Sequence, residues 1–381
     1  MEMRVITELR YFSIRCLVGI LCVLMWMGLS WGKVSGPCSA CHTMHNSQNS
    51  SPVAENGGSS QPFEALLIGD CIFCHTGTNT GTNKIPYVLS TTPPTYNFGG
   101  FRNTLAGGNF YWVQQTNGDR KGHNVAGIAP PDAALGLTPP GYDPNDYPSV
   151  TGTYRPATWT QQLTCAGNFG CHGRFDATNS SLNDPIVAIL GAHHKNITRT
   201  NGTAPATEVW NSYRFLWGIK GTEDPNYEYG NPSPTEHNGY YASTSAGDTG
   251  SINYLCGECH GKFHWSTYVG YASPWLRHPT DFDMNTVASK GYGNYPNVNI
   301  FAGKLGVTNP HDYFADVPVG NTQGAALPSV LNTSGDAIVL CLSCHRAHVS
   351  PYDYILRWNY VAWPGIPDDQ NGCLACHTNK W

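Results

Sequence analysis

Five short segments repeat one arrangement of cysteine and histidine: two cysteines separated by two residues, then a histidine directly after the second. This C-x-x-C-H spacing marks covalent attachment of haem c. The thiols join the two vinyl groups of one haem, and the histidine binds the iron. The segments are CSACH at 38–42, CIFCH at 71–75, CGECH at 256–260, CLSCH at 341–345 and CLACH at 373–377. Five matches in one chain exclude chance.

Two further cysteines lie in CAGNFGCH at 165–172 with a gap of five residues, and His172 follows the second directly. A disulfide across this small loop is the alternative. The haem interpretation accounts for all twelve cysteines beyond residue 32 as six pairs that each end in Cys-His, and glycines in the gap permit a tight backbone path. We therefore predict six haems, bound through Cys38, Cys41, Cys71, Cys74, Cys165, Cys171, Cys256, Cys259, Cys341, Cys344, Cys373 and Cys376.

Each haem iron has a second axial position, which a second protein ligand fills in an electron-transfer centre. Methionine cannot serve six haems, because only Met44 and Met284 follow residue 32. Histidine can. Six of the 15 histidines belong to the attachment segments: His42, His75, His172, His260, His345 and His377. The other nine are His45, His123, His193, His194, His237, His264, His278, His311 and His348. Nine candidates for six positions predict bis-histidine ligation with about three histidines to spare.

Three of these histidines follow an attachment segment closely: His45 and His348 by three residues, and His264 by four. On a short helical turn, such residues share a face with the motif histidine. They cannot bind the same iron from the opposite side. Each is therefore expected to reach a neighbouring haem or none.

The composition favours loops over long regular elements. Charged residues make up 12% of the chain, against about 25% in typical domains. The 42 glycines and 27 prolines favour turns, while 21 tyrosines, 13 phenylalanines and 11 tryptophans exclude a disordered composition. A net charge of −5 gives no basic surface for nucleic acid.

Residues 1–32 are typical of an export signal. Arg4, Arg10 and Arg15 precede the uncharged run 16–29, and the small residues Ser30 and Gly32 precede a cleavage point. A retained anchor is the alternative, although a membrane span needs about 20 apolar residues. We expect a haem domain of residues 33–381 that crosses the inner membrane and acts at the cell surface or outside the cell, with the periplasm as the alternative.

No long segment has a helical or strand periodicity. The predicted fold is a mostly irregular multihaem c-type cytochrome with short helices around the haem motifs, for example near CLSCHRAH and YDYILRWNY. It forms one elongated domain built around a chain of haems. The aromatic residues are expected to pack against the haems.

In the order of its motifs and in its extra histidines, the chain resembles the extracellular hexahaem nanowire cytochromes of metal-reducing bacteria and their relatives with doubled CxxCH motifs. The resemblance rests on CSACHTMHNS, GGNFYWVQQTNGDRKGHNVAG, CGECHGKFH with the following LRHP, CLSCHRAHVSPYDYILRWNY and GCLACHTNKW. It implies a filament of identical subunits with a continuous haem chain. It also implies that His45 binds the haem on Cys341, Cys344 and His345 of the adjacent subunit. The matching extra histidines are His45, His123, His264, His278 and His348.

The third site departs from that family, in which it is an ordinary CxxCH with a histidine three residues later. Here the gap is longer and GRF follows His172. Its second ligand must come from elsewhere, and His193 or His194 in GAHH are the nearest candidates. His237 and His311 would then be spare.

The predicted function is long-range electron transfer without enzymatic activity. Copies of the chain would polymerise and exchange electrons with donors and acceptors at the outer membrane or outside the cell. A monomeric electron shuttle is the first alternative. A multihaem reductase with an open iron at the third site is the second, although no CxxCK motif occurs.

Overall fold

The computed structural model describes residues 37–44, 47–48, 51–52, 64–144, 155–194, 208–264, 278–291, 293–362 and 365–377. His45 and the predicted export segment 1–32 lie outside these residues. Within them, no helix has the length and apolar character needed to cross a membrane.

Regular elements are short. The helices are α2 Cys71–His75, α3 Pro185–Ala188, α4 Ile252–Gly257, α5 Gly261–His264, α6 Val298–Phe301 and α7 Cys341–Cys344. The 3₁₀ segments are Cys38–Ala40, Glu64–Leu66, Phe110–Gln114, Asp119–Lys121, Ser180–Asn183, Ala192–His194, Val209–Asn211, Tyr213–Phe215, Met284–Lys290, Lys304–Gly306, Asp353–Ile355, Tyr360–Ala362, Asp368–Gln370 and Gly372–Ala375. The predicted fold class is confirmed: short helices, little sheet and mostly irregular chain.

The strands form four pairs. Three are antiparallel: β1 Ser47–Gln48 with β2 Ser51–Pro52, β5 Gly221–Thr222 with β6 Gly239–Tyr240, and β7 Val319–Gly320 with β8 Ile338–Val339. The fourth, β3 Thr164–Ala166 with β4 Gly170–His172, is parallel. Parallel strands normally need a long crossover between them, and here only three residues separate the two strands. This pair contains the third attachment segment.

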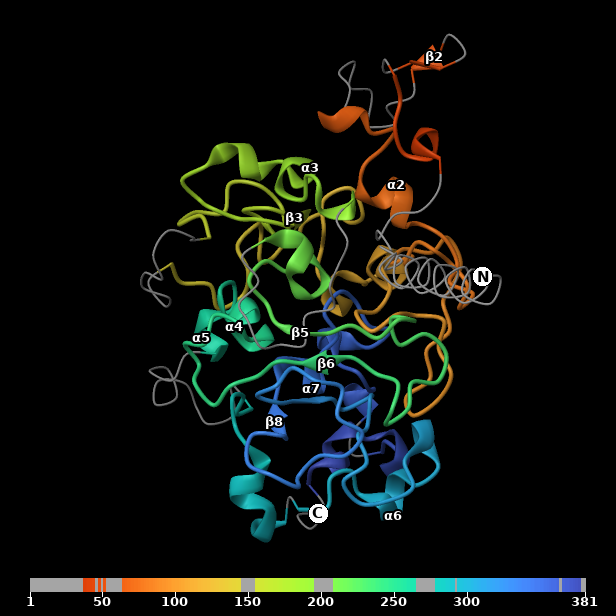
Figure 1. Ribbon diagram of the computed structural model, residues 1–381, viewed down its shortest axis with the longest axis vertical. Helices are drawn as coiled ribbons and strands as arrows, with labels where there is room; N and C mark the ends of the chain where they lie inside the picture. Colours follow the sequence, from red (N-terminus) through yellow and green to blue (C-terminus); the bar gives the residue numbers. More distant parts are fainter. Residues whose placement is uncertain are drawn as a thin grey trace, which may run out of the picture.

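The molecule is elongated, with N-terminal elements at one end of the long axis and C-terminal elements toward the other (Figure 1). The segments of β2 and α2 lie at the upper end, β5 and β6 near the middle, and α6 toward the lower end. Distant parts of the chain are also in contact. The Tyr96 hydroxyl donates to the Arg357 carbonyl at 2.8 Å, and Val349 forms isolated β-bridges with Gly108 and with Gly122. The chain therefore forms one connected body.

Side-chain caps begin the helices of the second and fourth attachment segments. Asp70 accepts a hydrogen bond from the Phe73 amide at 2.9 Å at the start of α2. Ser251 accepts one from the Tyr254 amide at 3.1 Å at the start of α4. These caps satisfy amides that a helix leaves unpaired. Local hydrogen bonds thus define where the attachment turns begin.

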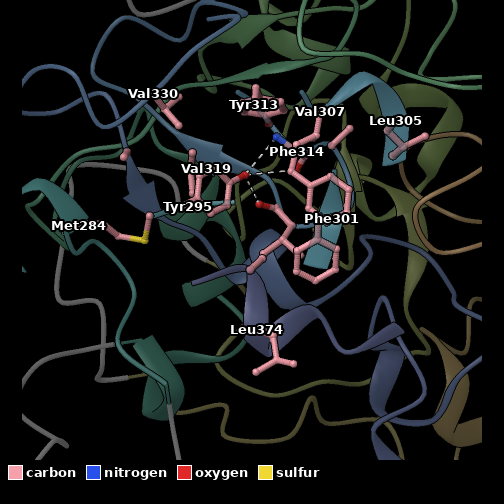
Figure 2. Close-up of a cluster of buried hydrophobic side chains, with 14 of the residues drawn as sticks. Met284, Tyr295, Phe301, Leu305, Val307, Tyr313, Phe314, Val319, Val330 and Leu374 are labelled. Carbon is pink, nitrogen blue, oxygen red and sulfur yellow. Dashed lines mark hydrogen bonds between the residues drawn. The ribbon is translucent and has the colours of Figure 1, made fainter. Parts of the chain in front are cut away.

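The largest cluster of buried apolar side chains belongs to the C-terminal part (Figure 2). The Tyr295 hydroxyl donates to the Val317 carbonyl at 2.6 Å and accepts from the Phe314 amide at 3.3 Å, so this buried phenol is satisfied. The Phe301 and Phe314 ring centres lie 5.0 Å apart. The aromatic residues predicted to pack against haems therefore also form a protein core of their own, a contribution that the composition did not reveal.

A buried ion cluster joins three distant segments. Arg102 lies 2.7 Å and Arg346 3.5 Å from the Asp316 carboxylate, and all three side chains are at most 1% exposed. Arg346 directly follows the motif histidine His345. Asp316 therefore anchors the fifth attachment segment to the segment that contains Arg102.

We expect Asp316→Asn to lower the free energy of unfolding by about 3–5 kcal/mol, because it leaves two buried guanidinium groups without their carboxylate. Chemical denaturation followed by circular dichroism measures this. The control is Asp353→Asn, which removes the partner of Arg120, a side chain that is 57% exposed. That change should cost less than about 1 kcal/mol. Equal effects of the two substitutions would contradict the anchoring role.

Candidate haem sites

Five attachment segments form short helical turns, as predicted. The amide of the motif histidine donates to the carbonyl of the first cysteine in four of them, at 2.9 Å from His42 and 3.0 Å from His260, His345 and His377. In the other, α2 spans the whole motif. A helical turn brings residues three apart onto one face. Both thiols of each segment therefore face the same side.

The third segment reaches a similar arrangement by a different route. In the parallel pair β3 and β4, Thr164 lies opposite Gly170 and Ala166 opposite His172. Cys165 and Cys171 are consequently neighbours across the pair. Adjacent strands lie about 4.8 Å apart, which is close to the about 5–6 Å between residues three apart on a helix. The two cysteines are not joined as a disulfide.

The loop between these two strands is held from inside by Asn168. Its side-chain nitrogen donates to the Asn179 carbonyl at 3.0 Å and to the side-chain oxygen of Asn183 at 2.8 Å. Its side-chain oxygen accepts from the Asp176 backbone amide at 2.7 Å. Asn168 is 1% exposed. A buried amide with three partners fixes a loop firmly.

Five of the six motif histidines face a second histidine ring. The ring centres lie 5.8 Å apart for His42 and His194, 6.4 Å for His75 and His193, 6.1 Å for His172 and His348, 6.2 Å for His260 and His123, and 6.1 Å for His377 and His278. With metal–nitrogen bonds of about 2 Å, two imidazoles on opposite sides of one metal atom have ring centres about 6 Å apart. The spacing therefore fits bis-histidine ligation of haem iron.

Hydrogen bonds orient these rings. In seven of the proposed ligands, Nδ1 donates to a backbone carbonyl, which leaves Nε2 with its lone pair for a metal. The distances are 2.8 Å from His42 to Ala65, 2.8 Å from His75 to Pro86, 2.9 Å from His172 to Arg214, 2.8 Å from His260 to Pro140, 2.9 Å from His345 to Tyr354, 2.9 Å from His123 to Ala347 and 3.0 Å from His278 to Pro279.

The first, third and fifth motif histidines share one local structure that the sequence did not reveal. Each accepting carbonyl belongs to the first of two consecutive left-handed residues: Ala65 and Leu66, Arg214 and Phe215, Tyr354 and Ile355. The second left-handed residue accepts from the amide that follows the histidine, at 2.8, 2.7 and 2.9 Å. A leucine follows each pair, at Leu67, Leu216 and Leu356. Left-handed non-glycine residues cost about 1–2 kcal/mol each, so the surrounding fold stabilises these dipeptides.

The sequence signal of these dipeptides is weak: a large apolar residue, Leu66, Phe215 or Ile355, comes second, and a leucine follows. None of the residues is glycine or asparagine, which usually mark left-handed positions. The second and fourth motif histidines instead use proline carbonyls, Pro86 and Pro140.

Three histidines have Nε2 engaged by protein. His264 Nε2 lies 2.6 Å from the Asp281 carboxylate, His237 Nε2 donates to the Leu327 carbonyl at 3.1 Å, and His311 Nε2 donates to the Gly293 carbonyl at 3.0 Å. His237 and His311 are the two histidines that are expected from the sequence to be spare. His264 requires a correction, because α5 directs its ring into the interior against Asp281 and away from the role of iron ligand predicted for it.

The second ligand predicted for the third site also requires a correction. His348, not His193 or His194, faces His172. The turn Ala192–His194 presents its two adjacent rings to His75 and His42 instead. His348 follows the fifth attachment segment and faces the motif histidine of the third.

His345 differs from the other motif histidines. In the part of the chain that the structure describes, no second histidine ring faces it. Its Nδ1 donates to Tyr354 in the same way as in the other sites. The ring is therefore oriented for a ligand that the described residues do not supply.

Loss of hydration keeps two of the second histidines neutral. It lowers the pKa of His348 to about 3, with further lowering by His172, and the pKa of His123 to about 4, with further lowering by His260. A histidine with a pKa well below 7 is unprotonated at neutral pH and presents a free lone pair. Both rings are therefore ready to bind a metal.

Cysteines of successive sites lie beside one another. A hydrogen bond with Cys165, together with burial, raises the pKa of Cys71, and a hydrogen bond with Cys341, together with burial, raises the pKa of Cys256. Burial raises the pKa of three further cysteines whose charge also interacts with a neighbouring site: Cys74 near Cys41, Cys259 near Cys171, and Cys344 near Cys373. The six sites therefore follow one another in sequence order as a line.

The chain is also similar in sequence to known proteins. Residues 332–380, which hold the fifth and sixth sites, match the family model described as "Doubled CXXCH motif". The chain is 29% identical over 372 residues to "C-type cytochrome OmcS" of Geobacter sulfurreducens, covering 84% of this chain and 78% of the relative. The chain is similar to a c-type cytochrome. The resemblance predicted from the motifs is thereby confirmed.

Two solved structures of OmcS also align with the chain. They are described as "Outer Membrane Cytochrome S Filament from Geobacter Sulfurreducens", with a TM-score of 0.46 and 20% identity, and as "Cryo-EM of the OmcS nanowires from Geobacter sulfurreducens", with a TM-score of 0.42 and 21% identity. Each alignment covers 86% of this chain and 85% of the other.

The loop of the third site leads to a prediction about Gly167. A Cβ there would lie 2.2 Å from the Leu182 carbonyl oxygen, and Gly167 has φ +86°. Gly136 has φ +71° and nothing within 4 Å of such a Cβ. Both alanine substitutions strain the backbone, but only Gly167→Ala forces the loop apart. We expect Gly167→Ala to cost about 1–3 kcal/mol more in free energy of unfolding than Gly136→Ala. Equal costs in chemical denaturation would contradict a tightly packed loop.

Proposed function

We propose that this chain is a bis-histidine hexahaem c-type cytochrome that transfers electrons over long distances. Copies of it would join head to tail into a filament outside the cell. One observation carries the proposal: five motif histidines each face a second histidine at the spacing of two ligands on one metal atom. Saturated irons suit electron transfer, whereas substrate chemistry needs an open position.

The residues have distinct roles in this proposal. Six cysteine pairs would hold the haems, five on helical turns and the third on β3 and β4. Each motif histidine would bind one face of an iron, with His194, His193, His348, His123 and His278 on the opposite faces of the first, second, third, fourth and sixth. Carbonyl acceptors would hold the ring orientations through oxidation and reduction. Haem c, when bound, supplies the iron couple that accepts and donates single electrons.

The proposed polymer depends on the fifth site. Of the nine histidines outside the motifs, five face a motif histidine and three have Nε2 engaged by protein, which leaves His45. We propose that His45 of one subunit ligates the iron at His345 of the next. Donor and acceptor then lie on different parts of the same chain. Such a heterologous contact repeats without closing and forms an open filament. The similarity to OmcS, a protein solved as a filament, supports this proposal.

A reductase remains the second candidate, with the fifth site rather than the third as its open position. The third site is disfavoured because His348 faces His172 at 6.1 Å. The fifth is favoured by the lack of a facing ring for His345 among the described residues. A high-spin iron signal in intact filaments would support the reductase and oppose the proposal.

Single histidine substitutions should distinguish an iron ligand from a spare histidine. His348→Ala should convert one haem per chain from low spin to high spin, because the third iron loses one of its two protein ligands. His311→Ala should leave every haem low spin. Electron paramagnetic resonance of the purified proteins measures both. A low-spin third haem in His348→Ala would contradict the pairing of His172 with His348.

Filament assembly should depend on His45. His45→Ala should retain six haems by intact mass but lose filaments in electron micrographs, because no ligand reaches the next subunit. It should also show one high-spin haem. The matched control is Met44→Ala, which changes the neighbouring side chain, 88% exposed, and should still polymerise. Filaments of normal length from His45→Ala would refute the ligand exchange, and a wild-type protein that is always monomeric would favour a shuttle.

A further inference from the structure

The loop of the third attachment segment contacts a buried arginine, Arg155, which belongs to no haem motif. Arg155 Nη1 donates to the carbonyl oxygens of Gly167, at 3.2 Å, and Gly170. The Asn168 carbonyl lies 3.5 Å from the same nitrogen. All three carbonyls lie between Cys165 and Cys171, within the five-residue gap. The Arg155 side chain is 3% exposed.

The other edge of the same guanidinium binds the fourth attachment segment. Arg155 Nε donates to the Glu258 carboxylate at 3.1 Å, and Nη2 lies 3.1 Å from the same oxygen. Glu258 stands between Cys256 and Cys259 in CGECH. One side chain therefore connects the cysteine spacers of two successive sites.

A third contact fixes the plane of the guanidinium. Its central carbon lies 3.8 Å from the centre of the Phe175 ring, in the geometry of a cation–π contact. Phe175 is three residues beyond His172 and is buried. The guanidinium thus has one orientation, with its nitrogens toward the loop on one side and toward Glu258 on the other.

The loop needs such a partner for a physical reason. In a C-x-x-C turn, helical hydrogen bonds satisfy the backbone between the two thiols. In the five-residue gap, backbone amides bond to the Gly167 and Phe169 carbonyls, and Arg155 bonds to the buried Gly170 carbonyl. A buried carbonyl without a partner costs about 1–3 kcal/mol. Arginine carries five donors in a planar fork, whereas lysine offers one nitrogen at a single point. The fork can satisfy several carbonyls and a carboxylate at once.

We propose that Arg155 is the positioning residue of the third site, which holds Cys165 and Cys171 at the separation needed for attachment and ties this separation to the fourth site through Glu258. The inference rests on the proposed function, because it presumes that the third segment carries a haem. It extends that function by assigning a residue outside every haem motif to the C-x5-C-H site.

The decisive variant is Arg155→Lys, which keeps a positive charge opposite Glu258 and so protects the fold. Haems per chain are counted by intact mass, and free thiols at Cys165 and Cys171 are mapped by alkylation and peptide mass spectrometry. We expect a fraction of chains to lack one haem, with alkylation confined to these two cysteines. Full occupancy of the third site in Arg155→Lys would overturn the proposal. The control is Arg174→Lys, on an exposed side chain of the same segment, which should keep six haems.

A second pair of variants separates loop positioning from charge balance. Arg155→Met should lose the third haem in more chains than Arg155→Lys does, but it also leaves Glu258 buried without a partner. The double variant Arg155→Met with Glu258→Met removes that charge. Continued loss of the third haem alone supports positioning of the loop. Recovery of six haems would overturn it, because the arginine would then serve only to neutralise Glu258.

The wild-type protein distinguishes failure of this inference from failure of the proposed function. Five haems in the wild type, with Cys165 and Cys171 free, would remove the third haem from the proposed function itself. Six haems in both the wild type and Arg155→Lys would leave the electron-transfer proposal intact and reject only the role of Arg155.

Discussion

The separation of about 6 Å between paired imidazole rings is the constraint on which the rest of this structure depends. Ring centres about 6 Å apart leave space for one metal between two nitrogens, and this spacing recurs five times. Without a metal between them, two rings at this distance do not hold each other in place. The fold must therefore hold each ring from behind, and the Nδ1 bonds to backbone carbonyls do so.

That requirement explains why so little regular structure is enough. Each carbonyl acceptor needs only a short turn, and the elements are accordingly two to seven residues long. At three sites the acceptor is the first of two left-handed residues, a conformation that local sequence disfavours. Tertiary contacts must stabilise it. Buried polar links across the chain, such as Asp316 with Arg102 and Arg346, give irregular segments a rigid frame.

The third site illustrates how one geometric demand can be met by two backbones. A helical turn and a pair of parallel strands both bring two cysteines to about 5 Å. The loop between the strands satisfies part of its own backbone, since the Gly167 carbonyl accepts from the Gly170 amide and the Phe169 carbonyl from the Thr164 amide. It also has partners outside the strand pair: Asn168 bonds to neighbouring segments, and Arg155 bonds to the Gly167 and Gly170 carbonyls. The unusual spacing therefore makes the site depend on a residue outside the motif.

The spacing of cysteine and histidine along the chain was enough to predict many features of this protein. C-x-x-C-H specifies a turn, two thiols on one face and a histidine beside them, so the attachment residues and the mostly irregular fold could be predicted from the amino-acid order. The count of histidines indicated two ligands per iron. His348 was expected at a neighbouring site, because a helical turn prevents two histidines three residues apart from binding opposite faces of one iron.

Only the tertiary structure decided which histidine faces which. His193 and His194 are adjacent in the chain but serve different motif histidines, and His264 turns to Asp281 although its spacing resembles that of a ligand. The left-handed carbonyl acceptors and Arg155 were also not predicted from the sequence. These roles depend on contacts between segments tens to hundreds of residues apart. Sequence spacing constrains neighbours along the chain, whereas ligand pairing depends on how distant loops pack together.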